Sequence, residues 1–170
     1  MKNKVYLIII VAILAVSAYG AYRYYSKPNG STVESREELL NSTSEGIKWK
    51  IAQEQKLEDY LVSSIYSSTK SGIAVFKANG DEKYKLAFKK WGNSDEIVTY
   101  ELIIGEEWYD LIWFNGAETA YAEIIYSVDG AENEPIIFDV SDMRVICSKA
   151  PAKDYILTVR YYDNDGNVYE

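Results

Sequence analysis

From Gly72 to the C-terminus, apolar residues recur at every second position, and this periodicity constrains the fold more than any other feature of the chain. Such alternation is typical of β-strands, in which successive side chains point to opposite faces of a sheet. The alternating segments are short and end at turn-forming pairs such as Asn79-Gly80 and Asp129-Gly130. About nine strands are predicted, at residues 73–78, 83–89, 96–104, 108–114, 119–128, 135–140, 143–148, 155–162 and 167–169.

Short strands at this spacing favour a mainly β fold, as an antiparallel sandwich or barrel over residues 72–170. Pro151 precedes Tyr155, and Leu157 and Val159 follow it in alternation. This pattern resembles the corner before the penultimate strand of fibronectin type III and immunoglobulin-like sandwiches, where a tyrosine hydroxyl bonds back to the backbone. The resemblance implies an antiparallel immunoglobulin-like β-sandwich and implies nothing about function.

Residues 28–71 are predicted to form a linker and a helical segment. The run from Ser31 to Glu34 matches a capping box, which favours a helix start at this point. A second helix is predicted over residues 47–68, because Leu57, Leu61 and Ile65 recur every four residues and would share one apolar stripe. This helix either packs on the sandwich or holds it away from a membrane.

The N-terminal residues 1–27 are predicted to be a signal-anchor transmembrane segment. The 18 residues from Val5 to Tyr22 carry no charge, and Lys2 and Lys4 precede them. A helix of this length spans about 27 Å, close to the hydrocarbon thickness of a bilayer. Tyrosines at both ends favour a retained anchor, whereas the small residues around Ser17 also fit a cleaved secretory signal. Both interpretations place the remaining chain outside the cytoplasm, either as a single-pass membrane protein or as a secreted one.

Composition excludes several classes of function. The chain has no His and one Cys, so arrangements of Ser with His or of Cys with His are absent, as are most transition-metal sites. The net charge of −8 repels phosphate backbones, so nucleic-acid binding is not expected. No cofactor and no metal ion is predicted.

Three short motifs receive structural interpretations. Ser67 and Lys70 have the Ser-x-x-Lys spacing of penicillin-binding enzymes, but the other motifs of those enzymes are missing, so a polar helix end that runs into a turn is predicted. Asp163 to Asn167 begins like a calcium loop, but Glu170 comes too early to close it, so a hairpin turn is predicted. Cys147 lies between apolar neighbours and is predicted to be packed and unreactive. No enzymatic activity is predicted.

Aromatic residues gather in and beside the predicted strand 108–114, which is apolar on both faces. Trp108 lies on one face, and Tyr109 and Trp113 lie on the other. Since only one face of a strand packs in the core of a two-sheet sandwich, the other is either covered by the helix at 47–68 or exposed. An exposed face would place Trp108, Tyr109, Trp113 and Tyr121 as candidate ligand-binding residues.

The sequence therefore predicts a non-catalytic, membrane-tethered extracytoplasmic domain that binds a protein partner or regulates an envelope complex. The alternative is a carbohydrate- or cell-wall-binding module that uses exposed aromatic residues.

Overall fold

The computed structural model describes residues 14–17, 28–44, 46–93, 98–114, 120–140 and 145–169. Within these ranges the fold is mainly β with antiparallel sheets, as the alternating sequence predicts. The helix that packs on the sheets is α2 (Val33–Ser42). The strands are β1 (Lys50–Leu57), β2 (Tyr60–Tyr66), β3 (Lys70–Ala78), β4 (Tyr84–Asn93), β5 (Val98–Ile104), β6 (Glu107–Trp113), β7 (Tyr121–Val128), β8 (Ala131–Glu132), β9 (Ile136–Asp139), β10 (Val145–Lys149), β11 (Ile156–Tyr162) and β12 (Val168–Tyr169).

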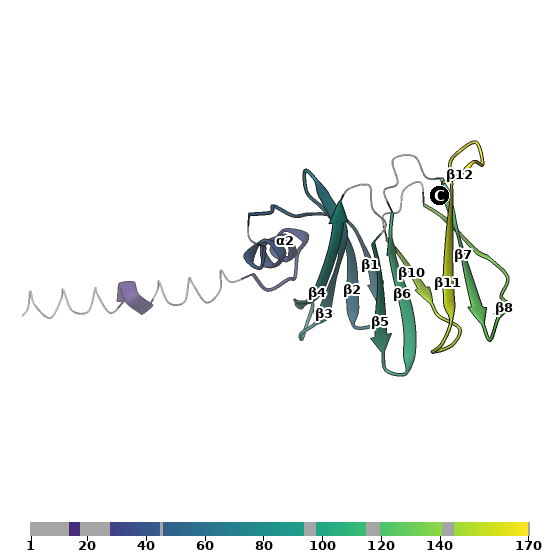
Figure 1. Ribbon diagram of the computed structural model, residues 1–170. Coiled ribbons are helices and arrows are strands. Elements are labelled where there is room, and N and C mark those ends of the chain that lie inside the picture. The colour runs from purple at the N-terminus through teal and green to yellow at the C-terminus, as the bar shows by residue number, and fades with distance from the viewer. Residues whose placement is uncertain are drawn as a thin grey trace, which may run out of the picture.

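The strands form three sheets. Sheet A has the order β1-β2-β3-β4, sheet B has the order β10-β6-β5, and sheet C has the order β12-β11-β7, with β8 and β9 both paired to β7. Every strand predicted after Gly72 has a counterpart in these sheets. Figure 1 shows α2, sheet A, sheet B and sheet C side by side in this order, so that sheet B is an inner layer.

Apolar cores fill the spaces between these four layers. The α2–A core contains Leu40, Trp49 and Phe76, the A–B core contains Val75, Leu111 and Trp113, and the B–C core contains Ile112, Phe114 and Ile124. Successive side chains of β6 point alternately into the A–B core and the B–C core, so both faces of this strand are buried. This double burial explains why residues 108–114 are apolar on both faces.

The prediction of a helix over residues 47–68 is wrong, because this segment forms β1 and β2. A spacing of four residues is even, so it keeps side chains on one face of a strand as well as on one stripe of a helix. Leu61 and Ile65 accordingly share the face of β2 that packs in the α2–A core. The sheet continues through β3, which spans residues 70–78 and therefore crosses the predicted boundary at residue 71.

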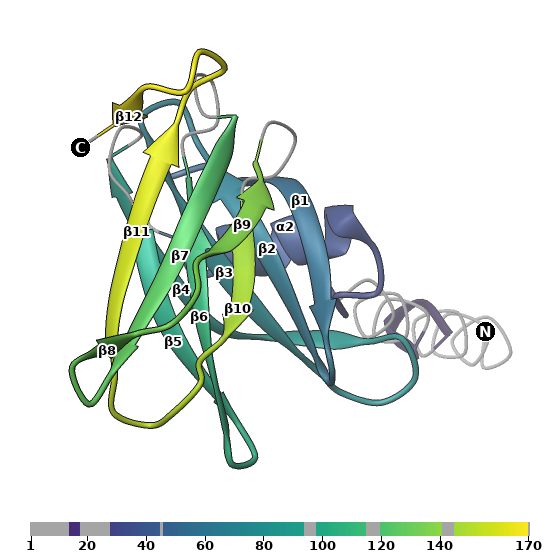
Figure 2. The ribbon, with the colours of Figure 1, turned by 90° about the vertical axis from the view of Figure 1, so that its right-hand side faces the viewer.

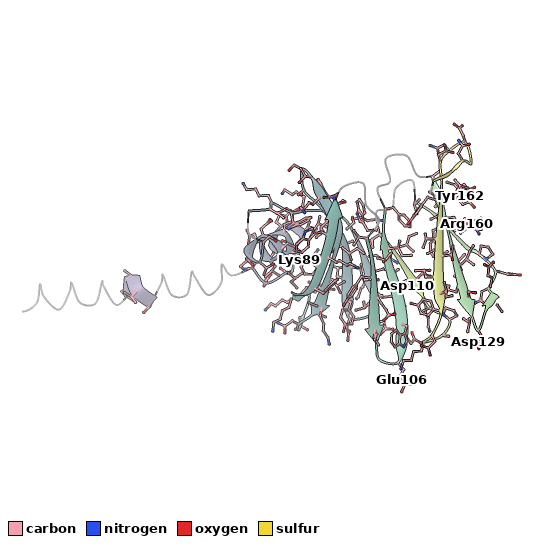
Figure 3. All side chains as sticks on the ribbon, viewed as in Figure 1. Lys89, Glu106, Asp110, Asp129, Arg160 and Tyr162 are labelled. Carbon is pink, nitrogen blue, oxygen red and sulfur yellow. The ribbon has the colours of Figure 1, made fainter. Side chains whose placement is uncertain are left out.

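α2 packs on sheet A and begins where the capping-box pattern predicts a helix start. The side-chain oxygen of Thr32, and not that of Ser31, accepts a hydrogen bond of 3.2 Å from the backbone N–H of Ser35 at the first turn. At the last turn, the ammonium of Lys89 donates to the backbone oxygen of Thr43 at 3.1 Å. Figure 3 shows Lys89 beside α2, where burial lowers the pKa of its ammonium group.

The predicted anchor lies almost entirely outside the described residues. Of residues 1–27, the structure describes only 14–17, a helical turn in which Leu14 and Val16 are exposed. Among the described residues, no helix has the length and apolar character that crossing a bilayer requires.

Candidate binding site

The structure separates the four candidate aromatic residues. Tyr109 and Trp113 are 8% and 5% exposed and pack in the A–B core. Trp108 is half-buried at the margin of the B–C core, with the ammonium of Lys153 5.9 Å from its ring centroid. The face that carries Tyr109 and Trp113 is therefore covered, but by sheet A and not by a helix.

Tyr121 lies apart from these three residues, on the outer face of sheet C. Its ring stacks on that of Tyr162, with the centroids 4.4 Å apart and the planes inclined by 7°. The hydroxyl of Tyr162 donates to Glu123 at 2.7 Å, and Arg160 lies 3.8 Å from the same carboxylate. Figure 3 shows Arg160 and Tyr162 on this sheet.

The outer face of sheet C has exposed apolar side chains toward its margins, whereas Ile125 of β7 on the same face is buried. Figure 2 shows sheet C nearest the viewer, with no described element in front of it. Ile137, Ile156 and Val168 are 64%, 67% and 52% exposed. Strand register places all three on the same side of the sheet as Tyr121 and Tyr162. This surface therefore combines exposed β-branched side chains with a stacked tyrosine pair.

A buried carboxylate lies on the other side of sheet C, in the space between sheets B and C. Asp110 of β6 is 6% exposed. Its Oδ1 accepts a hydrogen bond of 2.9 Å from the hydroxyl of Tyr155, and its Oδ2 accepts one of 2.9 Å from the hydroxyl of Tyr126. The Tyr126 oxygen also lies 2.9 Å from Oγ of Ser148. Because the single hydroxyl proton of Tyr126 goes to Asp110, Ser148 donates to Tyr126.

No described basic side chain forms an ion pair with Asp110. Burial raises the pKa of its carboxyl group, and the hydrogen bonds from Tyr155 and Tyr126 only partly oppose this effect. Burial and the neighbouring carboxylate also raise the pKa values of both tyrosines, so their hydroxyls stay protonated and act as donors.

A cavity of about 410 Å³ opens beside Asp110. It is lined by Lys90, Thr99, Tyr100, Glu101, Asp110 and Leu157. Glu101 of β5 is the direct cross-strand partner of Asp110, so the two carboxylates project from the same face of sheet B. Lys90 of β4 donates from its Nζ to the backbone oxygen of Thr99 at 2.8 Å. The cavity thus has two acidic groups and one amine that is already engaged by the backbone.

Asp110 is not among the candidate residues predicted from the sequence, which are all aromatic. The usable signal is the position of the acid within residues 108–114. A strand that is apolar on both faces is buried on both faces, so an acidic residue near its middle is buried too.

Two of the short sequence motifs lie in a turn and in a strand, respectively. Ser67 and Lys70 close the turn between β2 and β3, and the backbone N–H of Ser67 donates to the Lys70 backbone oxygen at 2.7 Å. The predicted turn is therefore confirmed, whereas the prediction that a helix ends here is wrong. Cys147 is half-buried, and burial raises the pKa of its thiol to about 12, as expected for an unreactive cysteine.

The motif at Asp163 is a turn, as interpreted from the sequence. The Asp163 carboxylate accepts hydrogen bonds from the backbone N–H groups of Asp165 and Asn167 at 2.9 and 2.8 Å. In the described part of the chain, no group of three or more metal-ligating side chains occurs.

No protein-family model, curated protein or solved structure matches the chain.

Proposed function

We propose that the chain is a non-catalytic, membrane-tethered extracytoplasmic domain that binds a protein partner through the outer face of sheet C. The observation that carries the proposal is the exposure of Ile137, Ile156 and Val168 on one uncovered sheet face. A sheet face with exposed apolar side chains and a polar surround is typical of protein-interaction surfaces. The surround here includes Glu123 and Arg160, which add polar groups without hiding the apolar ones.

The position of this face supports tethering at the opposite end. α2 packs against sheet A, and sheet C is the layer farthest from α2 (Figure 1). An anchor within residues 1–27 joins the chain just ahead of α2, so sheet C would lie away from the bilayer and face partners. Secretion after cleavage of the N-terminal segment is the alternative, and it leaves the same face accessible.

We also propose that residues 98–169 form an immunoglobulin-like sandwich. Sheet B contains the first, second and fifth main strands of this region, β5, β6 and β10, and sheet C contains β7, β11 and β12 with β9 beside β7. This distribution agrees with the strand arrangement of immunoglobulin folds. Tyr155, directly before β11, supports the corner motif, although its hydroxyl bonds to the carboxylate of Asp110 rather than to the backbone.

A carbohydrate-binding role is the second candidate, and the stacked pair of Tyr121 and Tyr162 favours it. In the stacked pair, each tyrosine ring contacts its partner through one face only, so a sugar ring could stack on the opposite face. Glu123 and Arg160 supply polar groups beside the rings. Depletion of the domain by insoluble cell-wall material, reversed by free sugar and lost in Tyr162→Ala, would support this candidate. Unchanged supernatant concentration would exclude it.

Site-specific photo-cross-linking tests the leading proposal. A photoreactive residue is placed at Ile137 or Ile156 in the full chain, and at the exposed Glu38 of α2 as the matched control. The proposal predicts that both sheet C positions give the same protein adduct in cells that produce the chain, whereas position 38 does not. Equal labelling at all three positions, or none at 137 and 156, contradicts it.

A further inference from the structure

Asp110 is a buried carboxyl group that forms no ion pair with a described basic side chain. An ionised carboxylate has about four lone-pair sites, and the hydroxyls of Tyr126 and Tyr155 occupy two of them. Buried charges are normally paired with a charge of opposite sign, because burial without a partner is costly. The arrangement around Asp110 therefore leaves room for a cationic donor.

The cavity gives such a donor access to Asp110. β5 is the edge strand of sheet B, and Thr99, Tyr100 and Glu101 of this strand line the cavity together with Asp110. Glu101 is exposed, whereas Asp110 is buried, so the two carboxylates mark the entrance and the inner wall.

The lining also selects among cations. Leu157 and the half-buried Tyr100 provide apolar surface, which suits the methylene stem of a long side chain. Calcium needs about six to eight oxygen ligands, and no described group of three or more metal-ligating side chains is present. Anions are excluded by the two carboxylates. Lys90 is the cation in the lining, but its amine is held by the Thr99 backbone oxygen.

We propose that this cavity binds the ammonium or guanidinium end of a lysine or arginine side chain of a partner, in contact with Asp110 and Glu101. The identification of the carrier as a protein rests on the proposed function, whereas the recognition of an alkyl cation rests on the cavity alone. The site opens at the β5 edge of sheet B, with lining residues from sheets A, B and C, and Leu157 lies on the inner side of sheet C. It is therefore separate from the outer face of sheet C.

The test is a carboxyl carbon NMR titration of Asp110 in the full chain, with ethylguanidinium chloride as the probe. A cation that reaches a carboxylate lowers the pKa of that group by about 1 to 3 pH units. The site predicts a fall of this size with ethylguanidinium and a much smaller one with sodium chloride at the same ionic strength. Identical titration curves with the two salts would overturn the proposal.

Variants establish where the probe binds. Asp110→Asn is expected to abolish the probe-induced shifts of the Tyr126 and Tyr155 resonances, and Glu101→Gln to weaken probe binding several-fold. Glu106→Gln, in the exposed turn after β5 (Figure 3), is the matched control and is expected to change nothing. If Glu106→Gln weakens binding as much as Glu101→Gln does, the probe is responding to general surface charge and the proposed site is wrong.

Lys90→Gln provides a second readout. Removal of this amine takes a positive charge out of the lining, so the probe is expected to bind more tightly by a few-fold. Weaker binding would contradict the assignment of the ligand as a cation. Because neither measurement involves the outer face of sheet C, failure here leaves the photo-cross-linking test intact, and failure of the cross-linking leaves the cavity site intact.

Discussion

The interface between α2 and sheet A and the interface between sheets B and C each contain a shielded carboxylate, but they stabilise it differently. Glu54 of β1 receives two hydrogen bonds from the guanidinium of Arg36, at 2.7 and 2.5 Å, and a third from Ser63 at 3.0 Å. From the described residues, Asp110 receives hydrogen bonds from the hydroxyls of Tyr126 and Tyr155. Among the described residues, Glu54 has a guanidinium partner, whereas no described basic side chain forms an ion pair with Asp110. We therefore interpret Glu54 as an acid that stabilises the fold and Asp110 as an acid that can bind a cationic ligand.

Loss of the Arg36 guanidinium should have the largest effect on stability. Arg36→Met leaves the Glu54 carboxylate without its cation, and breaking a buried pair in this way costs about 3–5 kcal/mol. Urea unfolding followed by tryptophan fluorescence measures the loss. The double variant Arg36→Met/Glu54→Leu is expected to recover most of it, since no unpaired charge remains. A double variant as unstable as the single one would show that Arg36 acts through contacts other than its pair with Glu54, such as its hydrogen bond to the Gly30 backbone oxygen.

Removal of a tyrosine donor from Asp110 should have a smaller effect. Tyr155→Phe deletes one hydrogen bond to a charged group, which is worth about 1.5–3 kcal/mol. Tyr161→Phe is the matched control, because the buried Tyr161 hydroxyl has no hydrogen-bond partner among the described residues and its loss should be neutral or stabilising. Similar losses for the two variants in urea unfolding would contradict the special role of the Asp110 donors.

The pH dependence of stability should distinguish Asp110→Asn from the native chain. Burial raises the pKa of folded Asp110 above the ordinary value of 3.8, so in the intervening pH range the folded state binds more protons than the unfolded state. The Asp110 contribution to the free energy of unfolding therefore grows as pH falls through the folded pKa and is lost as pH rises. Asp110→Asn lacks this component and should have a higher thermal midpoint than the native chain at pH 7. The reverse order at pH 7 would indicate that the carboxylate is already stabilised.

The exposed ion pair between Lys149 and Glu107 should matter least. Its atoms lie 2.5 Å apart, but both side chains are about half exposed, at 56% and 44%. Solvent screens such pairs, so Lys149→Met is expected to leave the urea midpoint unchanged within error. A loss of stability close to that of Arg36→Met would mean that burial does not determine how much an ion pair stabilises this protein.

Local patterns in the sequence predict most of the strands but only part of the helical region. After Gly72, turn residues and alternation occur together, and both are local properties of the chain. Over residues 47–68 the spacing of Leu57, Leu61 and Ile65 fits a helix and a strand equally well, and only pairing with β3 decides between them. Pairing between distant segments is not encoded in local periodicity.

The candidate site was less predictable than the fold. Trp113 and Tyr109 are aromatic in a strand with two apolar faces, which fits an exposed ligand surface and an inner sheet alike. The structure covers them because sheet A packs on sheet B. Asp110 cannot be told from a surface acid by residue type, since its burial depends on strands far away in the sequence, β7 and β10.

The pKa of Asp110 in the unliganded full chain, measured by carboxyl carbon NMR, tests whether this buried carboxyl group lacks a cationic partner. We expect a pKa above the ordinary value of 3.8, because a buried carboxyl group without a cation favours its neutral form. A pKa at or below that value would be the opposite result, because it would show that hydrogen bonds or a positive charge of the chain itself already stabilise the ionised carboxylate.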